Sequence, residues 1–154
     1  MYTNSDDCKR GSTIDRCSWS NPIAISINSD GTANSKDQWE PAIHVSNITS
    51  ASKPRGTIHI TALDRREDTN NIQWKVWHYS CSPGATLGCR TATDWGNVVV
   101  SDEAIHNRDQ SFIGDYHGIT NIGTKEAYTV WSDSRNFGSP NNLDFDVMGD
   151  WTPR

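Results

Sequence analysis

The sequence predicts an all-β fold with many short strands and polar loops. The β-branched residues (13 Ile, 7 Val and 14 Thr) far outnumber Leu, Met and Ala (3, 2 and 9), and branching at Cβ favours the pleated strand over the helix. Glu, which helical proteins use freely, occurs only 4 times, whereas the turn-forming Asn, Asp, Ser and Gly number 13, 15, 17 and 11. No segment shows convincing helical periodicity.

The composition argues against a nucleic-acid-binding protein and a membrane-spanning protein, and it contains few of the apolar residues that form a core. With 154 residues and a net charge of -5, the chain does not resemble proteins that bind nucleic acid by neutralising phosphates. No apolar run approaches the roughly 18 residues of a membrane span, and residues 1–7 do not resemble a signal peptide. Leu, Ile, Val and Phe make up about 17% of the chain, which is thin for a self-sufficient domain, although 7 Trp and 4 Tyr can carry a core.

Several segments recur about 70 residues further along the chain. The alternating pattern of residues 56–66 returns in residues 125–135, 69 positions later, and both segments end in Asp-x-Arg. Three further matches are residues 37–46 with 109–120 (offset 72), residues 71–77 with 142–148 (offset 71) and residues 19–26 with 95–101 (offset 76). Repeats of this length are typical of stacked architectures, and loop insertions account for the drift in offset.

Each complete repeat is expected to form four strands. In the middle repeat we expect them at residues 43–45, 57–63, 73–79 and 98–100. A repeated four-stranded antiparallel sheet is the blade of a β-propeller, and a blade cannot bury its faces alone. We therefore expect one incomplete propeller segment over residues 1–154, of about two to three blades. Residues 1–26 end one blade, 37–101 form a complete blade, and 109–154 form part of the last.

The four cysteines form two close pairs, Cys8 with Cys17 and Cys81 with Cys89. Each pair encloses Gly and polar residues, as a hairpin loop does, and no CxxC motif of a zinc or haem site occurs. We expect two local disulfides, with four reduced thiols as the alternative. Disulfides would place the protein in the extracellular space or at the cell surface.

Four stretches resemble the sialidase-like, BNR/Asp-box family of six-bladed β-propellers: residues 37–46 (DQWEPAIHVS), 56–66 (GTIHITALDRR), 112–120 (FIGDYHGIT) and 130–136 (VWSDSRN). The last two are the most specific, and in that family they belong near the C-terminal end of the propeller. The resemblance thus implies that this chain supplies C-terminal blades. The structural Asp box of the family, S-x-D-x-G-x-x-W, is degenerate here, since residues 80–84 read SCSPG.

The resemblance also implies a set of candidate catalytic residues. Sialidases of this type clamp the substrate carboxylate with three arginines and use a tyrosine nucleophile and an aspartate acid/base, and here Arg66, Arg135 and Tyr116 are the residues that match. Beside Tyr116, the carboxyl of Asp115 is a further candidate, as a general base. These groups come from several blades, and fewer than three blades cannot present the whole set. The alternative for Tyr116 is packing between blades at the glycine-flanked start of a strand.

The Asp-x-Arg motif has a structural interpretation as well. It occurs at the same place in two consecutive repeats, and a residue that recurs once per blade usually holds the fold together. We therefore expect structural pairs that fix a turn, formed by Asp64 with Arg66 and by Asp133 with Arg135.

Aromatic residues suggest where a ligand could bind. Trp74 and Trp77 are three apart and must face opposite sides of a strand, so one of them is expected at an exposed or interface position where it can stack on a sugar ring. We take Trp74, Trp77, Tyr116 and His117 as candidate ligand-binding residues.

Evidence for a metal or cofactor is thin. Asp30 and Asp37 are oxygen donors in one loop, which indicates either a calcium site or an Asx-rich turn. His44, His59 and His78 occupy different expected strands without metal-ligand spacing, and no motif requires a cofactor.

We therefore expect an extracellular, non-catalytic binding or scaffolding module. It would be completed by other propeller blades or by identical subunits, because incomplete closure leaves open edges and apolar faces. Glycans are the candidate ligands, and neither nucleic acid nor a membrane span is expected. The alternatives are a C-terminal fragment of a sialidase-type exo-glycoside hydrolase and a structural subunit of an extracellular surface assembly.

Overall fold

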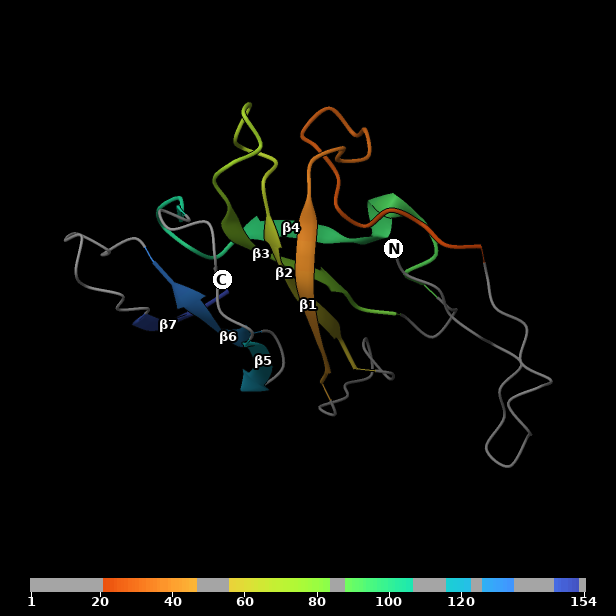
Figure 1. Cartoon of the computed structure of the whole chain (residues 1–154). Helices are drawn as coiled ribbons and strands as arrows, with labels where there is room; N and C mark the ends of the chain where they lie inside the picture. Colours follow the sequence, from red (N-terminus) through yellow and green to blue (C-terminus); the bar gives the residue numbers. More distant parts are fainter. Residues whose placement is uncertain are drawn as a thin grey trace, which may run out of the picture.

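The computed structural model describes residues 21–46, 56–83, 88–106, 116–122, 126–134 and 146–152. In these residues the strands form two antiparallel sheets, one of four strands and one of three (Figure 1). The predicted all-β class is confirmed. Within the same residues, no helix has the length and apolar character needed to cross a membrane.

The four-stranded sheet has the order β1-β2-β3-β4, which is also the order along the chain. Its strands are β1 (Gln38–Val45), β2 (Ile58–Asp64), β3 (Lys75–Cys81) and β4 (Gly96–Val99), with a 3₁₀ turn, η2 (Ala92–Asp94), before β4. The four strands expected for the middle repeat are present. The first begins five residues earlier than expected because a bulge between Trp39 and Ala42 accommodates Pro41, which cannot donate a ladder hydrogen bond.

The three-stranded sheet consists of β5 (His117–Ile122), β6 (Glu126–Asp133) and β7 (Asp146–Trp151), in that order. Its second and third strands repeat the register of β2 and β3. Asp64 pairs with Lys75 in the first sheet, and Asp133 pairs with Asp146 in the second. The two pairs are related by the offsets of 69 and 71 seen in the sequence, so the sequence repeat corresponds to one shared hydrogen-bonding register.

The first strand of each sheet follows a different offset from the one expected. Ile43 pairs with Ile60 in the first sheet, and Ile119 pairs in the second with Thr129, which lies 69 positions after Ile60. Ile43 and Ile119 are therefore equivalent, at an offset of 76 instead of 72. The expected offset of 72 was wrong because it compared the first residues of the two segments, 37 and 109, and insertions are tolerated between such positions and the strands that follow.

Alternation along β2 and β3 gives the four-stranded sheet two faces. The front face carries Ile58, Ile60, Ala62, Trp77, Tyr79 and Cys81, and the back face carries His59, Thr61, Leu63, Val76 and His78. Ile25 and Trp95 pack on the front face in one apolar cluster. The three-stranded sheet covers the back face, where Trp131 packs in a second cluster with Leu63 and Val76.

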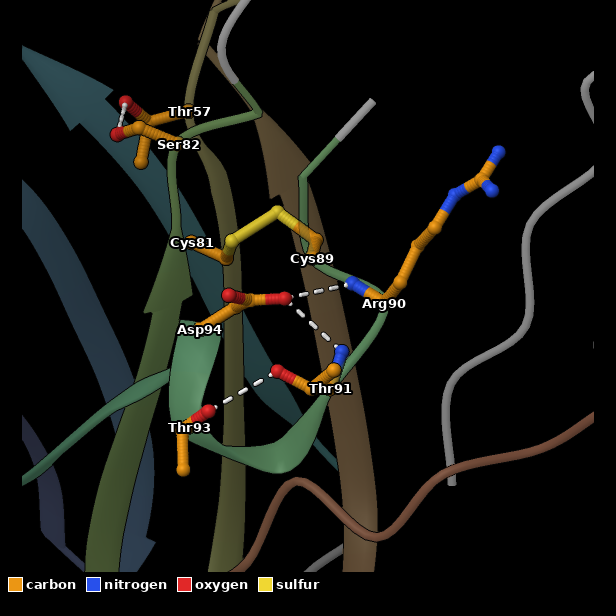
Figure 2. The surroundings of a disulfide bond; sticks show 8 residues. All are labelled: Thr57, Cys81, Ser82, Cys89, Arg90, Thr91, Thr93 and Asp94. Carbon is orange, nitrogen blue, oxygen red and sulfur yellow. Dashed lines mark hydrogen bonds between the residues drawn. A yellow bond between two sulfur atoms is a disulfide. The ribbon is translucent and has the colours of Figure 1, made fainter. Parts of the chain in front are cut away.

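The predicted disulfide between Cys81 and Cys89 is present and closes the loop after β3 (Figure 2). Both cysteines are buried, Cys89 completely. Beside it, the Asp94 carboxylate accepts two backbone hydrogen bonds, each of 2.9 Å, so this segment leads into η2 as an ordered turn. Cys8 and Cys17, the other expected pair, lie outside the described residues.

Replacing both Cys81 and Cys89 with alanine is expected to lower the free energy of unfolding by about 2–3 kcal/mol. The bond joins residues 8 positions apart, and without it the unfolded chain regains the conformational freedom of that loop. Urea unfolding in non-reducing buffer measures the difference from the wild type. Equal midpoints for the variant and the oxidised wild type would contradict a stabilising role.

Candidate ligand-binding cleft

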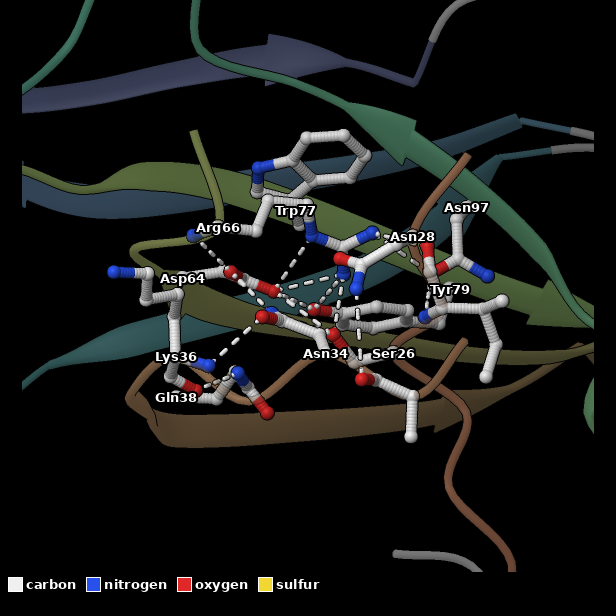
Figure 3. A network of polar contacts seen from close by, with 12 residues as sticks. Ser26, Asn28, Asn34, Lys36, Gln38, Asp64, Arg66, Trp77, Tyr79 and Asn97 are labelled. Atoms are coloured by element: carbon white, nitrogen blue, oxygen red, sulfur yellow. Dashed lines mark hydrogen bonds and ion pairs between the residues drawn. The ribbon is translucent and has the colours of Figure 1, made fainter. Parts of the chain in front are cut away.

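A buried aspartate organises one end of the front face (Figure 3). Asp64, the last residue of β2, accepts hydrogen bonds from the Tyr79 hydroxyl (2.7 Å), the Ser26 hydroxyl (3.1 Å) and the Asn34 amide (2.9 Å). Its charged partner is Arg66, at 2.7 Å, and the side chains of Arg66 and Asp64 are 6% and 0% exposed. The structure thus places this Asp-x-Arg motif in a buried ion pair at the turn after β2.

The equivalent aspartate of the second sheet is buried as well. Asp133 is 1% exposed and accepts a hydrogen bond of 3.0 Å from the indole N–H of Trp131. Both repeats therefore end their second strand in a buried, hydrogen-bonded carboxylate. Arg135, the expected partner of Asp133, lies outside the described residues.

Arg66 in turn fixes the ring of Trp77. The centre of its guanidinium lies 3.8 Å from the centroid of the Trp77 ring, in a cation–π contact. One terminal nitrogen donates to the Ile27 carbonyl (2.9 Å) and the Asn97 side chain (3.2 Å). The remaining N–H groups donate to the Asp64 carboxylate and to the hydroxyls of Ser26 and Tyr79. With its five N–H groups engaged inside the protein, Arg66 holds the tryptophan in place and has none left for a ligand carboxylate.

Trp77 borders a cleft of about 730 Å³ on the front face. Residues 27–31 form one side of it and residues 92–97 another. Trp77 and Trp95 contribute aromatic surface, while the polar lining side chains are Asn28, Ser29, Asp30, Arg66, Glu67, Thr93 and Asn97. An aromatic wall with several hydrogen-bonding groups around it is the usual composition of a small-molecule site.

A tight hairpin presents Asn28 and Asp30 at this cleft. The N–H of Gly31 donates to the Asn28 carbonyl at 2.9 Å, and Gly31 has a φ of 82°, which residues with a Cβ rarely adopt. The Asp30 carboxylate accepts hydrogen bonds from the hydroxyl and the N–H of Thr32, at 2.6 and 2.9 Å. These bonds, the hydroxyl's first, hold the pKa of Asp30 below its usual value, so the carboxylate is charged at neutral pH.

The two tryptophans of the third strand region face opposite sides, and only one borders the cleft. Trp74 is 1% exposed, and its ring packs edge-on against Trp39 with the centroids 5.4 Å apart. Trp74 is therefore a core residue, contrary to its selection as a candidate ligand-binding residue. Alternation along a strand predicts that two side chains diverge, but the covering sheet decides which of them is buried.

Tyr116 and His117 do not line the cleft. Tyr116 is 84% exposed in this chain, so its expected packing between blades stays a prediction. His117 begins β5, and its Nε2 lies 3.0 Å from the Thr61 hydroxyl on the back face. Burial lowers the pKa of His117 to about 4. Asp115 and Arg135 lie outside the described residues, so the catalytic set stays a prediction.

The two candidate calcium ligands belong to separate interactions. Asp37 pairs with Arg65 at 3.0 Å and accepts a hydrogen bond of 2.8 Å from Asn71, whereas Asp30 is bonded within its own hairpin. Among the described residues, no group of three or more His, Cys, Asp or Glu side chains is arranged to hold a metal ion.

The register of the strands brings together histidines that lie far apart in the sequence. Nδ1 of His59 lies 3.0 Å from Nε2 of His78, and the two buried rings stack on the back face. Burial, followed by the neighbouring His59, lowers the pKa of His78 to about 4. His44, opposite His59 in β1, bonds the side chain of Asn121 in β5. The interface between the sheets is therefore lined with imidazoles.

Sequence reasoning did not single out several residues of the cleft, namely Asn28, Glu67, Thr93, Trp95 and Asn97. Trp95 is 5% exposed and still lines the cleft. Asn28 and Glu67 come from loops, Thr93 comes from η2 and Asn97 from β4, so segments far apart in the chain supply these residues. Comparisons of the chain with protein-family models, with curated proteins and with solved structures gave no match.

Proposed function

We propose that the chain is a non-catalytic, extracellular carbohydrate-binding module built from sialidase-like propeller blades. The observation that carries the proposal is the position of Trp77. Its ring is fixed by the Arg66 guanidinium and borders a cleft of about 730 Å³ with amide, hydroxyl and carboxylate groups around it. A rigid aromatic ring stacks on the apolar face of a sugar, and the surrounding groups bond its hydroxyls.

The charges around the cleft favour a neutral sugar over an acidic one. Asp30 is ionised, and the positive charge of Arg66 is already neutralised by Asp64 at 2.7 Å. A ligand carboxylate would meet Asp30 without an uncommitted arginine to bind it. The same argument disfavours the alternative of a sialidase-type hydrolase fragment, because Arg66 is not available as part of a carboxylate clamp.

Two further observations support the wider setting of the proposal. The shared register of the two sheets is the relation expected between successive blades, and the Cys81–Cys89 disulfide is typical of proteins outside the cytoplasm. The two sheets pack face to face. The front face of the four-stranded sheet and the outer face of the three-stranded sheet are therefore the places where other blades or subunits would complete the propeller.

The test is binding of the full chain to an array of neutral and sialylated oligosaccharides, followed by titration of the best ligand. Trp77→Ala is expected to weaken neutral-glycan binding at least tenfold, which is roughly 1.4 kcal/mol, and Asn28→Ala is expected to weaken it less. Hydrolysis of a fluorogenic sialoside by the wild type is expected to be absent.

Ile72→Ala is the control, because Ile72 is 59% exposed and does not line the cleft. It should bind like the wild type, and circular dichroism should show the same strand content for all variants. A glycan that binds Trp77→Ala as tightly as the wild type, or no binding across the array, would overturn the proposal.

A further inference from the structure

The outer face of the three-stranded sheet carries an exposed apolar ridge. It is formed by Tyr128 and Val130 of β6 and by Val147 and Trp151 of β7, which share one face through the pairs Tyr128–Trp151 and Ser132–Val147. Val147 is 80% exposed, Trp151 41% and Val130 37%. The rings of Tyr128 and Trp151 meet edge to face at 4.9 Å, so the ridge has a defined shape. An apolar patch of this kind marks an interaction surface.

The front face of the four-stranded sheet, at the other end of the stack, carries an apolar groove of about 640 Å³. Ile25, Ile43, Ile60 and Ala62 line it. Ile43 is 62% exposed, although it belongs to the same face as the buried residues of β2. The groove therefore offers apolar surface next to the edge strand β1.

The packing inside the chain shows how two such faces meet. Trp131 is equivalent to Ala62, 69 positions earlier on the front face, and it packs on the back face in the cluster of Val76. The front face of the second sheet thus covers the back face of the first. Val147 lies 71 positions after Val76 and is its equivalent, yet Val76 is 0% exposed and Val147 is 80% exposed. The ridge is a back face without its covering sheet.

We propose that a second copy of this chain covers the ridge, with its groove over the ridge of the first copy. The contact would repeat the front-to-back packing already present between the two sheets. Ala62 leaves a groove where Trp131 fills the equivalent place of the second sheet, and the groove gives the protruding ridge room. Because ridge and groove are different surfaces, the association is head to tail and leads to a closed ring or a filament.

The decisive experiment mixes two variants of the full chain that each lack one surface. Val147→Asp removes the ridge, and Ile43→Asp removes the groove, so analytical ultracentrifugation is expected to show each variant alone at 17.2 kDa. The mixture is expected to form a 1:1 complex of twice that mass and nothing larger, since each copy retains one usable surface. The wild type should form larger species as its concentration rises.

Ile72→Asp is the control, because Ile72 is 59% exposed but belongs to neither surface, and it should associate like the wild type. Circular dichroism spectra equal to the wild type's will show that the variants are folded. A wild type that stays at 17.2 kDa at all concentrations, an Ile43→Asp variant that still associates, or a mixture without the 1:1 complex would each overturn the proposal.

Discussion

Replacing Asp64 with alanine is expected to lower the free energy of unfolding by about 3–5 kcal/mol. Asp64 neutralises Arg66, whose side chain is 6% exposed, and it accepts hydrogen bonds from Tyr79 and Asn34. Its removal leaves a buried guanidinium without a counter-charge, and it leaves the side chains of Tyr79, Asn34 and Ser26 without this acceptor. Urea unfolding monitored by tryptophan fluorescence measures the loss, which is large relative to the stability of a typical small domain.

A second aspartate–arginine pair in the same chain is the matched control. Asp37 and Arg65 lie 3.0 Å apart, but their side chains are 60% and 22% exposed. Asp37→Ala is therefore expected to cost no more than about 1 kcal/mol. The double variant Asp64→Ala/Arg66→Met should regain part of the stability lost in Asp64→Ala, because it removes the uncompensated charge. Equal effects of Asp37→Ala and Asp64→Ala would contradict the structural role of the buried pair.

Acidification is expected to destabilise the protein between pH 6.5 and about 4. His78 and His117 have ordinary pKa values of 6.5, and burial lowers both to about 4 in the folded chain. Protonation therefore favours the unfolded chain. The contribution of the two neutral histidines to the free energy of unfolding is fully present above pH 6.5 and is lost as the pH falls towards 4. For His78, which is 4% exposed, the full loss is about 3 kcal/mol.

The interface between the sheets explains why both histidines resist protonation. His78 shares a hydrogen bond with the ring of His59, and a proton on each facing nitrogen would place two donors against each other. His117 faces Thr61 from the second sheet, so its protonation would put a charge between the layers.

The slope of unfolding free energy against pH measures this effect. Between pH 5 and 6 the unfolded wild type should bind up to about two more protons than the folded chain. His78→Gln, which keeps a hydrogen-bonding side chain but does not titrate, should lower that number by about one. An unchanged slope in this variant would show that His78 is not responsible.

The sequence alone predicted much of the first sheet and its repetition. The excess of β-branched residues predicted the all-β class, and the Asp-x-Arg motifs predicted the equivalence of β2 with β6. The register confirms that equivalence, because Asp64 and Asp133 occupy the same paired position. The spacing within one loop also predicted the Cys81–Cys89 bond. These features depend on neighbours close in the chain or on an exact repeat, and a sequence displays both directly.

The cleft and the histidine contacts needed the tertiary structure. Alternation showed that Trp74 and Trp77 diverge, but only the second sheet, packed on the back face, determines that Trp74 is buried and that Trp77 borders the cleft. In the same way, His59 and His78 meet through the register of two strands. Local pattern thus determined which elements form and which side chains share a face. Burial, pKa and access to a ligand depend on what covers each face, and segments distant in the sequence provide that cover.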